Sequence, residues 1–549
     1  MSLRFAERAP DAHGHQLLIG RLLDSVLQTA PDQEIVYRDR VRLTYRSFHD
    51  RLGRLANTLG AAGAGEGTVV AVMDWDSHRY LECYFAVPMM GAVIQTVNVR
   101  LPPAQVLDTL DRAEAEILLV HRDFLPLLAA MGPLPERVRA FVLLEDERTG
   151  APIPSGFLGE YEALLAKAAP EHAFGEFDEN AIATTFFTSG TTGRPKAVQF
   201  SHRQIVLHTL AALGPWGNSP GTRTFGIADV YMPLTPMFHV HAWGMPYVAT
   251  LLGVKQVYPG RYEPDTILKL HQTEGVTFSH CVPTVLGMVL EAAARSGADL
   301  AGWLMVIGGA PLPPTLFRAG RAKGMELVVG YGMSETAPTL TISRPLPGVA
   351  EETALLSAGM PVPLVALRVV DEHGQTVPAD DSTRGELVVR APWLTQAYAG
   401  DAAASEALWR GGWLHTGDVA TQDRFGTLRI RDRLRDVIKS GGEWLCSTSI
   451  EHVLLELDGV AEVAVVGVPH PRWGERPVAV VVAKPGLSVS TEAANALLDQ
   501  EIAAGRLSRY ARLDRVDVVE ALPRTSVGKI DKKLLRAARA ATAETAASV

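Results

Sequence analysis

Short apolar runs alternate with longer helical patterns along much of the chain. Val69–Met73 and residues 117–120 are runs of apolar side chains rich in β-branched residues, and residues 103–113 between them have helical periodicity. Strand–helix–strand units of this kind feed a parallel sheet whose faces are covered by helices. Because the alternation returns over residues 256–294, the sequence predicts an α/β fold with two related α/β layers rather than one sheet.

From about residue 359 the residue pattern changes to one that predicts pairs of strands separated by turn residues. Residues 366–370 and 386–390 are strand-like, and the segment Asp-Glu-His-Gly at 371–374 is typical of a turn between them. The sequence therefore predicts a small β-rich subdomain in this part of the chain.

After the basic run at residues 429–435, we expect a compact α+β unit. It begins with a helix in which Thr448 and Glu451 fit a capping box and Gly459 is a stop signal. A length of 549 residues allows roughly three to four structural units, so these divisions are compatible with the chain length. The predicted organisation is a large N-terminal domain (1–432), a hinge (433–436) and a small C-terminal domain (437–549).

Composition and charge exclude several classes of protein. With 47% hydrophobic and 21% charged residues, the chain is expected to be a soluble globule, and its net charge of −9 argues against a nucleic-acid footprint over the whole surface. Three widely spaced cysteines form neither a disulfide framework nor a zinc pattern, and no secretory signal precedes them, so we expect a cytoplasmic protein. The uncharged run 230–254 is interrupted by three prolines and two histidines, which favours a buried core or cavity wall over a membrane span.

A ten-residue segment at 187–196 (FTSGTTGRPK) combines four hydroxyl side chains, two glycines and a lysine. Such a loop can offer backbone N–H groups, hydroxyls and an ammonium group to a polyphosphate. It differs from the Walker loop, since its glycines lie three apart and Lys196 follows Pro195. The alternative is a flexible turn after a strand. Another serine in a glycine-containing segment, Ser334, lacks the second glycine of a nucleophile elbow.

This segment resembles the phosphate loop of the adenylate-forming superfamily, which includes acyl-CoA synthetases, luciferases and peptide synthetase adenylation domains. Further motifs of the family follow in order across nearly the whole chain, at residues 236–239 (PMFH), 308–311 (GGAP), 330–335 (GYGMSE), 413–418 (WLHTGD), 432–436 (DRLRD) and 523–529 (PRTSVGK). Within the superfamily, residues 239–244, 439–444 and 469–477 look most like bacterial medium- and long-chain fatty acyl-CoA synthetases, with methylmercaptopropionate-CoA ligases as close relatives.

The resemblance implies roles for particular residues around ATP. The β- and γ-phosphates would be held by Thr188, Ser189, Gly190, Thr191, Thr192, Gly193 and Lys196. Ser334 would bind the α-phosphate, Glu335 would bind Mg²⁺, and Asp418, beside Arg433, would accept from the ribose hydroxyls. The adenine slot would be formed by Gly308, Gly309, Ala310, Pro311, Gly330, Tyr331, Gly332 and Met333. The alternatives are that Asp418 only caps a turn and that Glu335 is an ordinary solvated carboxylate.

The resemblance also implies roles in acyl transfer. Lys529 would swing over the α-phosphate, and Arg435, where Asp or Lys is common, would be the hinge of a mobile C-terminal domain. His239 and Trp243 would line the acyl pocket, and Lys439, Gly441, Gly442 and Trp444 would line the coenzyme A tunnel. The alternatives are an exposed basic tail for Lys529, a satisfied core histidine for His239 and core packing for Trp243. Ala197 departs from the usual glycine after the lysine.

The expected activity is that of an acyl-CoA synthetase which uses ATP, Mg²⁺ and coenzyme A on a hydrophobic carboxylic acid. One alternative within the family is an enzyme that catalyses a single half-reaction, either forming acyl-AMP for a carrier protein or using a preformed acyl-AMP. The alternative from another class is a catalytically silent acyl-nucleotide binding protein. Relatives of the fatty acyl type imply a homodimer formed through the N-terminal domain.

Overall fold

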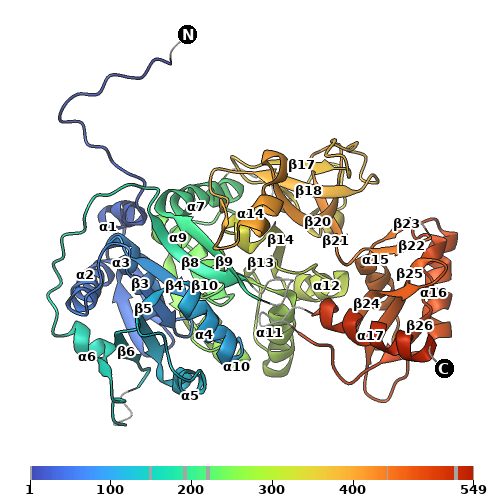
Figure 1. Ribbon diagram of the computed structural model, residues 1–549, viewed down its shortest axis with the longest axis horizontal. Helices are drawn as coiled ribbons and strands as arrows, with labels where there is room; N and C mark the ends of the chain where they lie inside the picture. Colours follow the sequence, from blue (N-terminus) through green and yellow to red (C-terminus); the bar gives the residue numbers. More distant parts are fainter. Residues whose placement is uncertain are drawn as a thin grey trace.

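Two large, mainly parallel sheets make up most of the protein (Figure 1). The computed structural model describes residues 3–147, 151–188, 194–217, 223–441, 443–524 and 530–547. The predicted α/β class with two related layers is confirmed. The expected run Val69–Met73 is a strand with these same bounds, buried at every position as expected for a parallel strand covered on both faces.

The first sheet has eight strands, and β3 lies near its centre. β4 and β5 flank β3 in parallel, with Val70 opposite both Ile94 and Ile117. In spatial order the strands are β19 (Tyr398–Ala399), β9 (Lys196–Ser201), β8 (Ile182–Thr188), β4 (Val93–Thr96), β3 (Val69–Met73), β5 (Ala115–His121), β6 (Ala140–Leu144) and β7 (Phe157–Glu160).

The second sheet has nine strands, of which β10 to β14 are parallel neighbours. Their order is β16 (Met360–Pro361), β15 (Thr339–Ile342), β14 (Glu326–Gly332), β13 (Leu304–Ile307), β12 (Phe278–Cys281), β10 (Val230–Leu234), β11 (Lys255–Tyr258), β1 (Glu34–Tyr37) and β2 (Val41–Thr44). One strand of the uncharged run, β10, therefore lies inside this sheet, in agreement with the predicted buried segment.

Helices cover both sheets and fill the space between them. α3 (His78–Met89) contacts β3, β4 and β8 of one sheet and β1 of the other, and it is buried along nearly its whole length, as a helix between two sheets must be. α7 (His202–Gly217) likewise contacts β9 and β15. The other helices of this part are α1 (Asp24–Thr29), α2 (Tyr45–Ala61), α4 (Pro103–Arg112), α5 (Leu125–Ala130), α6 (Tyr161–Leu165), α8 (Val240–Trp243), α9 (Met245–Leu251), α10 (Pro264–Glu274), α11 (Pro283–Ser296), α12 (Pro314–Ala322) and α13 (Glu351–Leu355).

The expected β-rich subdomain is a four-stranded antiparallel sheet. It contains β17 (Ala366–Val370), β18 (Gly385–Arg390), β20 (Leu414–Gln422) and β21 (Leu428–Arg433), with α14 (Ala402–Leu408) beside it. The expected turn after β17 is closed by the Gly374 N–H, which donates to the Asp371 carbonyl at 3.0 Å.

The last part of the chain is the expected α+β unit, on the right of Figure 1. Its sheet has the strands β23 (Glu443–Leu445), β22 (Ile438–Ser440), β25 (Gly474–Ala483), β24 (Val460–His470) and β26 (Arg515–Val518). Its helices are α15 (Ser447–Leu454), α16 (Thr491–Ala503) and α17 (Lys532–Ala547). Its apolar cores contain only residues from 438 onward, whereas the main core ends at Leu428.

The predicted capping box at Thr448 is wrong. α15 begins at Ser447, two residues before the start that a Thr448 cap predicts, and its N-cap is Cys446, whose side chain makes no capping hydrogen bond. Glu451 instead forms an ion pair with Lys532 at 2.6 Å, because α17 packs close enough to offer its ammonium group. The helix also ends at Leu454, before Gly459.

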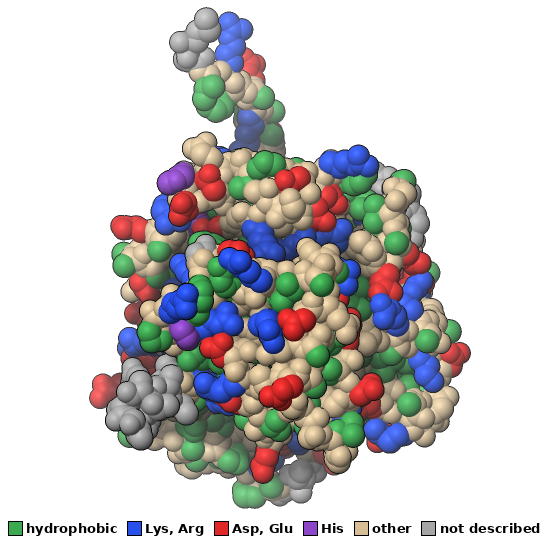
Figure 2. Space-filling model, turned by 90° about the vertical axis from the view of Figure 1, so that its right-hand side faces the viewer, with side chains coloured by type: hydrophobic (Ala, Val, Ile, Leu, Met, Phe, Trp, Pro, Cys, Tyr) green, Lys and Arg blue, Asp and Glu red, His purple; other side chains and the backbone are tan. Residues whose placement is uncertain are grey.

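On the surface, charged side chains of both signs are interspersed over the face drawn in Figure 2. This mixture is what a chain with 52 basic and 61 acidic residues leads one to expect. Among the described residues, no helix is both long and apolar enough to cross a membrane. The three cysteines are free and buried.

Candidate active site

The motif residues gather at the carboxyl ends of the parallel strands. The phosphate-loop segment (187–196) begins with the last two residues of β8, His239 follows β10, and Gly308 follows β13. Ligands of open α/β sheets bind at this edge, because the loops that leave it are free to vary without disturbing the sheet. The two sheets therefore present their motif loops to one region.

The base of the phosphate-loop segment is an antiparallel strand pair. Thr188 at the end of β8 lies directly opposite Lys196 at the start of β9. The Lys196 ammonium lies 4.4 Å from the centroid of the Tyr398 ring, a cation–π contact. Five predicted residues, Ser189, Gly190, Thr191, Thr192 and Gly193, lie outside the described residues.

Tyr398 connects the phosphate-loop segment to Glu335. The Tyr398 hydroxyl donates to Glu335 Oε1 at 2.5 Å, and the Glu335 carbonyl accepts from the Thr395 N–H at 3.0 Å. Burial and the Glu335 carboxylate raise the pKa of Tyr398, so its hydroxyl keeps its proton. Glu335 is only 7% exposed and Ser334 beside it is half-buried, so this carboxylate is not an ordinary solvated one.

A second polar cluster is centred on Asp418, in β20. One carboxylate oxygen accepts from the Tyr331 hydroxyl at 2.6 Å, and the other lies 2.7 Å from Arg433 Nε. Asp418 and Arg433 are register partners on β20 and β21, which explains why they meet. The Asp418 charge raises the pKa of Arg433. Tyr331 of this cluster lies four residues before Glu335, so one segment of the chain contributes to both clusters. The Asp418 carboxylate therefore does more than cap the turn after Gly417.

Glycines make the wall between the two clusters and β13 thin. A Cβ atom on Gly308 would lie 2.9 Å from the Gly330 carbonyl oxygen and 3.0 Å from Trp243 Cη2. A Cβ on Gly332 would lie 1.8 Å from the Pro338 carbonyl oxygen. Side chains are thus excluded where the sequence motif has glycine. Gly309, Ala310 and Pro311 continue from this wall, and Met333 follows Gly332.

The segment that carries Trp243 has an unusual backbone. Val240, His241, Ala242 and Trp243 all have positive φ angles, between 46° and 59°, and Gly244 follows at 73°. Left-handed conformations cost roughly 1–2 kcal/mol per non-glycine residue, so tertiary contacts must hold this turn. One of them is a 2.8 Å hydrogen bond between the side chains of His241 and Thr184, in β8.

The left-handed turn borders a cavity of about 250 Å³. His239 and Trp243 line it together with Gly309, and the remaining wall is mostly apolar, with Leu234, Pro236, Ile267, Val282, Val285, Met288 and Val289 among its residues. Behind it, His280 lies 5.1 Å from the Trp243 ring. Burial lowers the pKa of His280 to about 3, so this histidine is neutral. Such a wall suits an apolar acyl group.

A buried carboxylate, Asp76, supports the outer side of this cavity. It accepts from the Met237 N–H at 2.9 Å and from the hydroxyl of Tyr262, a lining residue, at 2.5 Å. Burial raises its pKa to about 7 despite these hydrogen bonds.

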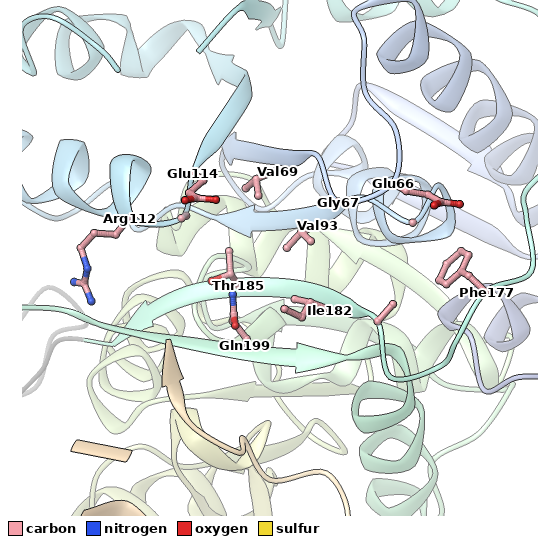
Figure 3. A pocket seen from close by; sticks show the side chains of 13 residues that line it. Glu66, Gly67, Val69, Val93, Arg112, Glu114, Phe177, Ile182, Thr185 and Gln199 are labelled. Atoms are coloured by element: carbon pink, nitrogen blue, oxygen red, sulfur yellow. The ribbon is translucent and has the colours of Figure 1, made fainter. Parts of the chain in front are cut away.

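A larger hollow, of about 530 Å³, lies elsewhere (Figure 3). Val69, Val93 and Ile182, the first residues of β3, β4 and β8, are among its lining residues, so it lies at the amino ends of these strands. In Figure 3 the Arg112 side chain turns away from this hollow, and its guanidinium donates to the Pro195 carbonyl at 2.6 Å. None of the predicted site residues within the described ranges lines the hollow, so its size does not make it the candidate site.

The predicted hinge residue lies between the two predicted domains, and the predicted coenzyme A residues lie in the C-terminal one. Arg435 falls between β21 and β22, and its side chain is 45% exposed. Lys439 and Trp444 face each other across the β22–β23 hairpin, with Lys439 Nζ 5.1 Å from the centroid of the Trp444 ring. Gly441, at the turn of this hairpin, has a φ of 59°. Across the described part of the chain, no hydrogen bond or ion pair joins this hairpin to Glu335 or Asp418. Gly442 and Lys529 lie outside the described residues.

Two residues of the site had no signal in the sequence. Tyr398 lies in a two-residue strand that pairs with β9, too short for any periodicity. Trp393 supports the Glu335 segment by donating from its indole to the Thr336 carbonyl at 3.0 Å. Only the long-range packing of the chain brings them to Glu335.

Comparison with known proteins identifies relatives over nearly the full length. The family model described as AMP-binding enzyme matches residues 23–399, and the model described as AMP-binding enzyme C-terminal domain matches residues 449–529. A long-chain-fatty-acid–CoA ligase of Thermus thermophilus is 38% identical over 97% of this chain and 94% of its own. A medium-chain-fatty-acid–CoA ligase of Ectopseudomonas oleovorans is 33% identical over 95% of this chain and 96% of its own.

Among solved structures, both the ATP-bound and the apo structure of MatB from Rhodopseudomonas palustris are similar to this chain. ATP-bound MatB matches 95% of this chain and 98% of its own with 26% identity and a TM-score of 0.80. Apo MatB matches 95% of this chain and 99% of its own with 25% identity and a TM-score of 0.71. The arrangement of this chain is thus nearer to the ATP-bound structure.

Proposed function

This chain belongs to the AMP-binding enzyme family, and from that premise we propose that it activates a hydrophobic carboxylic acid with ATP and transfers the acyl group to coenzyme A. It is an ATP-dependent, AMP-forming acyl-CoA synthetase. The first half-reaction yields acyl-AMP and pyrophosphate, and the second yields the thioester and AMP. Two observations carry the proposal together: the segment 330–335 takes part in both the Glu335 and the Asp418 clusters, and His239 and Trp243 line an apolar cavity.

In the first half-reaction, two anions must approach, because the carboxylate attacks the α-phosphate of ATP. We assign Lys196 and Thr188, with the loop between them, to the β- and γ-phosphates and Ser334 to the α-phosphate. Among the described residues Lys196 forms no ion pair, so its charge is available to an anionic ligand. Preorganised cations of this kind stabilise the charge that develops as pyrophosphate leaves. We also assign Lys529 to the α-phosphate, as the resemblance implies.

Glu335 is the proposed Mg²⁺ ligand. Its carboxylate is buried, and among the described residues it accepts one side-chain hydrogen bond, from the Tyr398 hydroxyl, which leaves oxygen lone pairs for a hard cation such as Mg²⁺. A bound Mg²⁺ would neutralise phosphate charge. The part of the chain that the structure describes contains no cluster of three His, Cys, Asp or Glu side chains that could hold a metal, so phosphate oxygens would supply other ligands.

The nucleoside would lie between the glycine wall and Asp418. The carboxylate of Asp418 can accept from ribose hydroxyls, while Arg433 and Tyr331 fix its orientation. The segments 308–311 and 330–333 would flank adenine, since their glycines leave room for a planar ring. The acid would extend into the 250 Å³ cavity, with His239 and Trp243 at its junction with the nucleotide.

For the second half-reaction, we propose that the C-terminal domain (437–549) turns relative to the N-terminal domain (1–432) about the segment 433–436, with Arg435 as the hinge. Separate apolar cores on the two sides of this segment support the division. The thiol would enter along Lys439, Gly441, Gly442 and Trp444.

Two further properties are proposed on narrower grounds. Three buried, unpaired cysteines suit a reducing compartment such as the cytoplasm. A homodimer through the N-terminal domain rests on the resemblance to fatty acyl relatives, and light scattering of the purified protein tests it.

The test is a panel of carboxylic acids incubated with the purified protein and ATP, with and without coenzyme A, and with Mg²⁺ present or chelated. We expect AMP and the CoA thioester to form in equal amounts, and the thioester to form only when the acid, coenzyme A and Mg²⁺ are all present. Acyl-AMP without thioester would assign the protein to the first half-reaction alone. No turnover, with acyl-nucleotide binding retained, would overturn the proposal in favour of a silent binding protein.

A further inference from the structure

The carboxylate of Asp432 reaches from the N-terminal side of the proposed hinge to the C-terminal side. Asp432 lies in β21 and is 3% exposed. Its Oδ2 atom accepts from the Ser447 N–H at 2.5 Å and from the Ser447 hydroxyl at 2.7 Å. Ser447 is the first residue of α15. The two groups are thus close in space although a hinge is proposed between them.

These contacts supply a cap that α15 lacks. The first N–H groups of a helix have no partner inside the helix, and the N-cap side chain normally accepts from one of them. In α15 the N-cap residue is Cys446, which makes no such hydrogen bond. Asp432, which lies in a strand of the other domain, provides this cap instead of the N-cap residue. Its negative charge suits a helix N-terminus.

The same contact extends to α17. Lys532 Nζ donates to the Ser447 hydroxyl at 2.7 Å and forms the 2.6 Å ion pair with Glu451. The Lys532 side chain is 13% exposed, and its charge acts on Asp432. Asp432, Ser447 and Lys532 therefore join β21 to both α15 and α17, the helix that follows the motif at 523–529.

The chain as a whole matches the ATP-bound neighbour with a TM-score of 0.80 and the apo neighbour with 0.71, and on this basis we take the orientation in which the contact forms as the ATP-bound one. A rotation about residues 433–436 would carry Ser447 and Lys532 away from Asp432. The helix would then lose its cap, and the carboxylate would pass from hydrogen-bonded burial to water. The contact therefore belongs to one orientation of the C-terminal domain.

We propose that Asp432 is a positioning residue, a cross-domain cap that holds the C-terminal domain in the orientation for acyl-AMP formation and releases Ser447 before transfer to coenzyme A. This inference rests on the proposed function and on the hinge at 433–436. It assigns Asp432 no contact with either substrate.

The test compares Asp432→Ala with Asp432→Asn and with Ser490→Ala. Asn is as good a helix cap as Asp, so Asp432→Asn keeps the hydrogen bond to Ser447. Ser490 caps α16 by accepting from the Ala493 N–H at 3.1 Å, entirely within the C-terminal part, so Ser490→Ala removes a cap without touching the domain contact. For each variant, acid-dependent ATP/pyrophosphate exchange and thioester formation from supplied acyl-AMP are measured with the most active acid of the panel.

The expected result is that Asp432→Ala lowers the ratio of exchange to thioester formation about tenfold, equivalent to about 1.4 kcal/mol. Asp432→Asn should recover most of this ratio, and Ser490→Ala should leave it unchanged. Equal losses of both half-reactions, or an unchanged ratio, would overturn the assignment of Asp432.

A second measurement does not depend on activity. Trypsin cleaves after Arg433 and Arg435, so faster release of the C-terminal fragment from Asp432→Ala than from Ser490→Ala reports a freed linker. If no acid supports turnover, the proposed function fails, while the cleavage rates still decide whether Asp432 holds the domains together. Equal rates would contradict the proposal.

Discussion

Tyr398 makes two interactions in the candidate site, one with Glu335 and one with Lys196, that substitutions can remove one at a time. Its hydroxyl donates to Glu335 at 2.5 Å, and its ring lies 4.4 Å from the Lys196 ammonium. Tyr398→Phe removes only the hydroxyl, whereas Tyr398→Leu removes the ring as well. Both variants keep a buried apolar side chain in β19.

The structure sets the size of the expected effects. A hydrogen bond to a charged group contributes about 1.5–3 kcal/mol, and the lower end of this range corresponds to about a tenfold fall in kcat/KM for ATP for Tyr398→Phe. A cation–π contact contributes about 0.5–2 kcal/mol, so Tyr398→Leu should lower kcat/KM for ATP by about a further twofold to thirtyfold. The second loss should be accompanied by a higher KM for ATP, because Lys196 loses its orientation.

The assay is acid-dependent ATP/pyrophosphate exchange over a range of ATP concentrations, with Tm measured on the same samples. Tyr37→Phe is a matched control, since the buried Tyr37 hydroxyl donates to Asp146 at 2.7 Å, and Asp146 is not one of the predicted site residues. It should lower Tm without changing exchange. If Tyr398→Phe retains full kcat/KM, or loses activity only in proportion to Tm as the control does, the link between Tyr398 and Glu335 has no catalytic role.

Three further changes test other parts of the site. Trp243→Ala should broaden or shift the preference for acyl length, read from the acid panel, because the indole borders the cavity; an unchanged profile with a large fall in Tm would favour core packing. Lys529→Ala should abolish ATP/pyrophosphate exchange while transfer from supplied acyl-AMP survives, and equal loss of both would contradict its assignment. Asp76 has a folded pKa of about 7 against an ordinary 3.8, so the stability it contributes is present at low pH and is lost as pH rises through 7. The Tm of Asp76→Asn should therefore rise relative to wild type between pH 4 and pH 8, by the equivalent of at most about 4 kcal/mol, and a constant difference would contradict the raised pKa.

Much of the fold could be predicted because local pattern and tertiary position agree. Val69–Met73 is apolar at every position because both faces of β3 are covered, so its bounds follow from composition alone. The capping box at Thr448 failed for the opposite reason. The Thr448 hydroxyl donates to the Arg431 carbonyl, and Glu451 forms an ion pair with Lys532. Both side chains therefore interact with partners that are distant in the sequence.

The candidate site likewise contains residues that could be predicted from the sequence and residues that could not. Asp418 and Arg433 could be paired from their motifs, and their register on β20 and β21 then fixes the geometry. Tyr398 could not be found, because its position depends on the pairing of β19 with β9, and a two-residue strand has no pattern of its own.

The left-handed turn at residues 240–243 is the point at which local rules fail most clearly. Nothing in Val-His-Ala-Trp favours positive φ, and glycine comes only at 244, where a Cβ would lie 2.9 Å from His208 Cε1. The turn therefore persists because His241 is bonded to Thr184 and Gly244 is packed against α7, so its strain is balanced by contacts with β8 and α7. Strained backbone of this kind concentrates at functional sites, because only a requirement on side-chain direction offsets its cost. Here that direction places Trp243 between Gly308 and the cavity, which is where an acyl group and a nucleotide would have to meet.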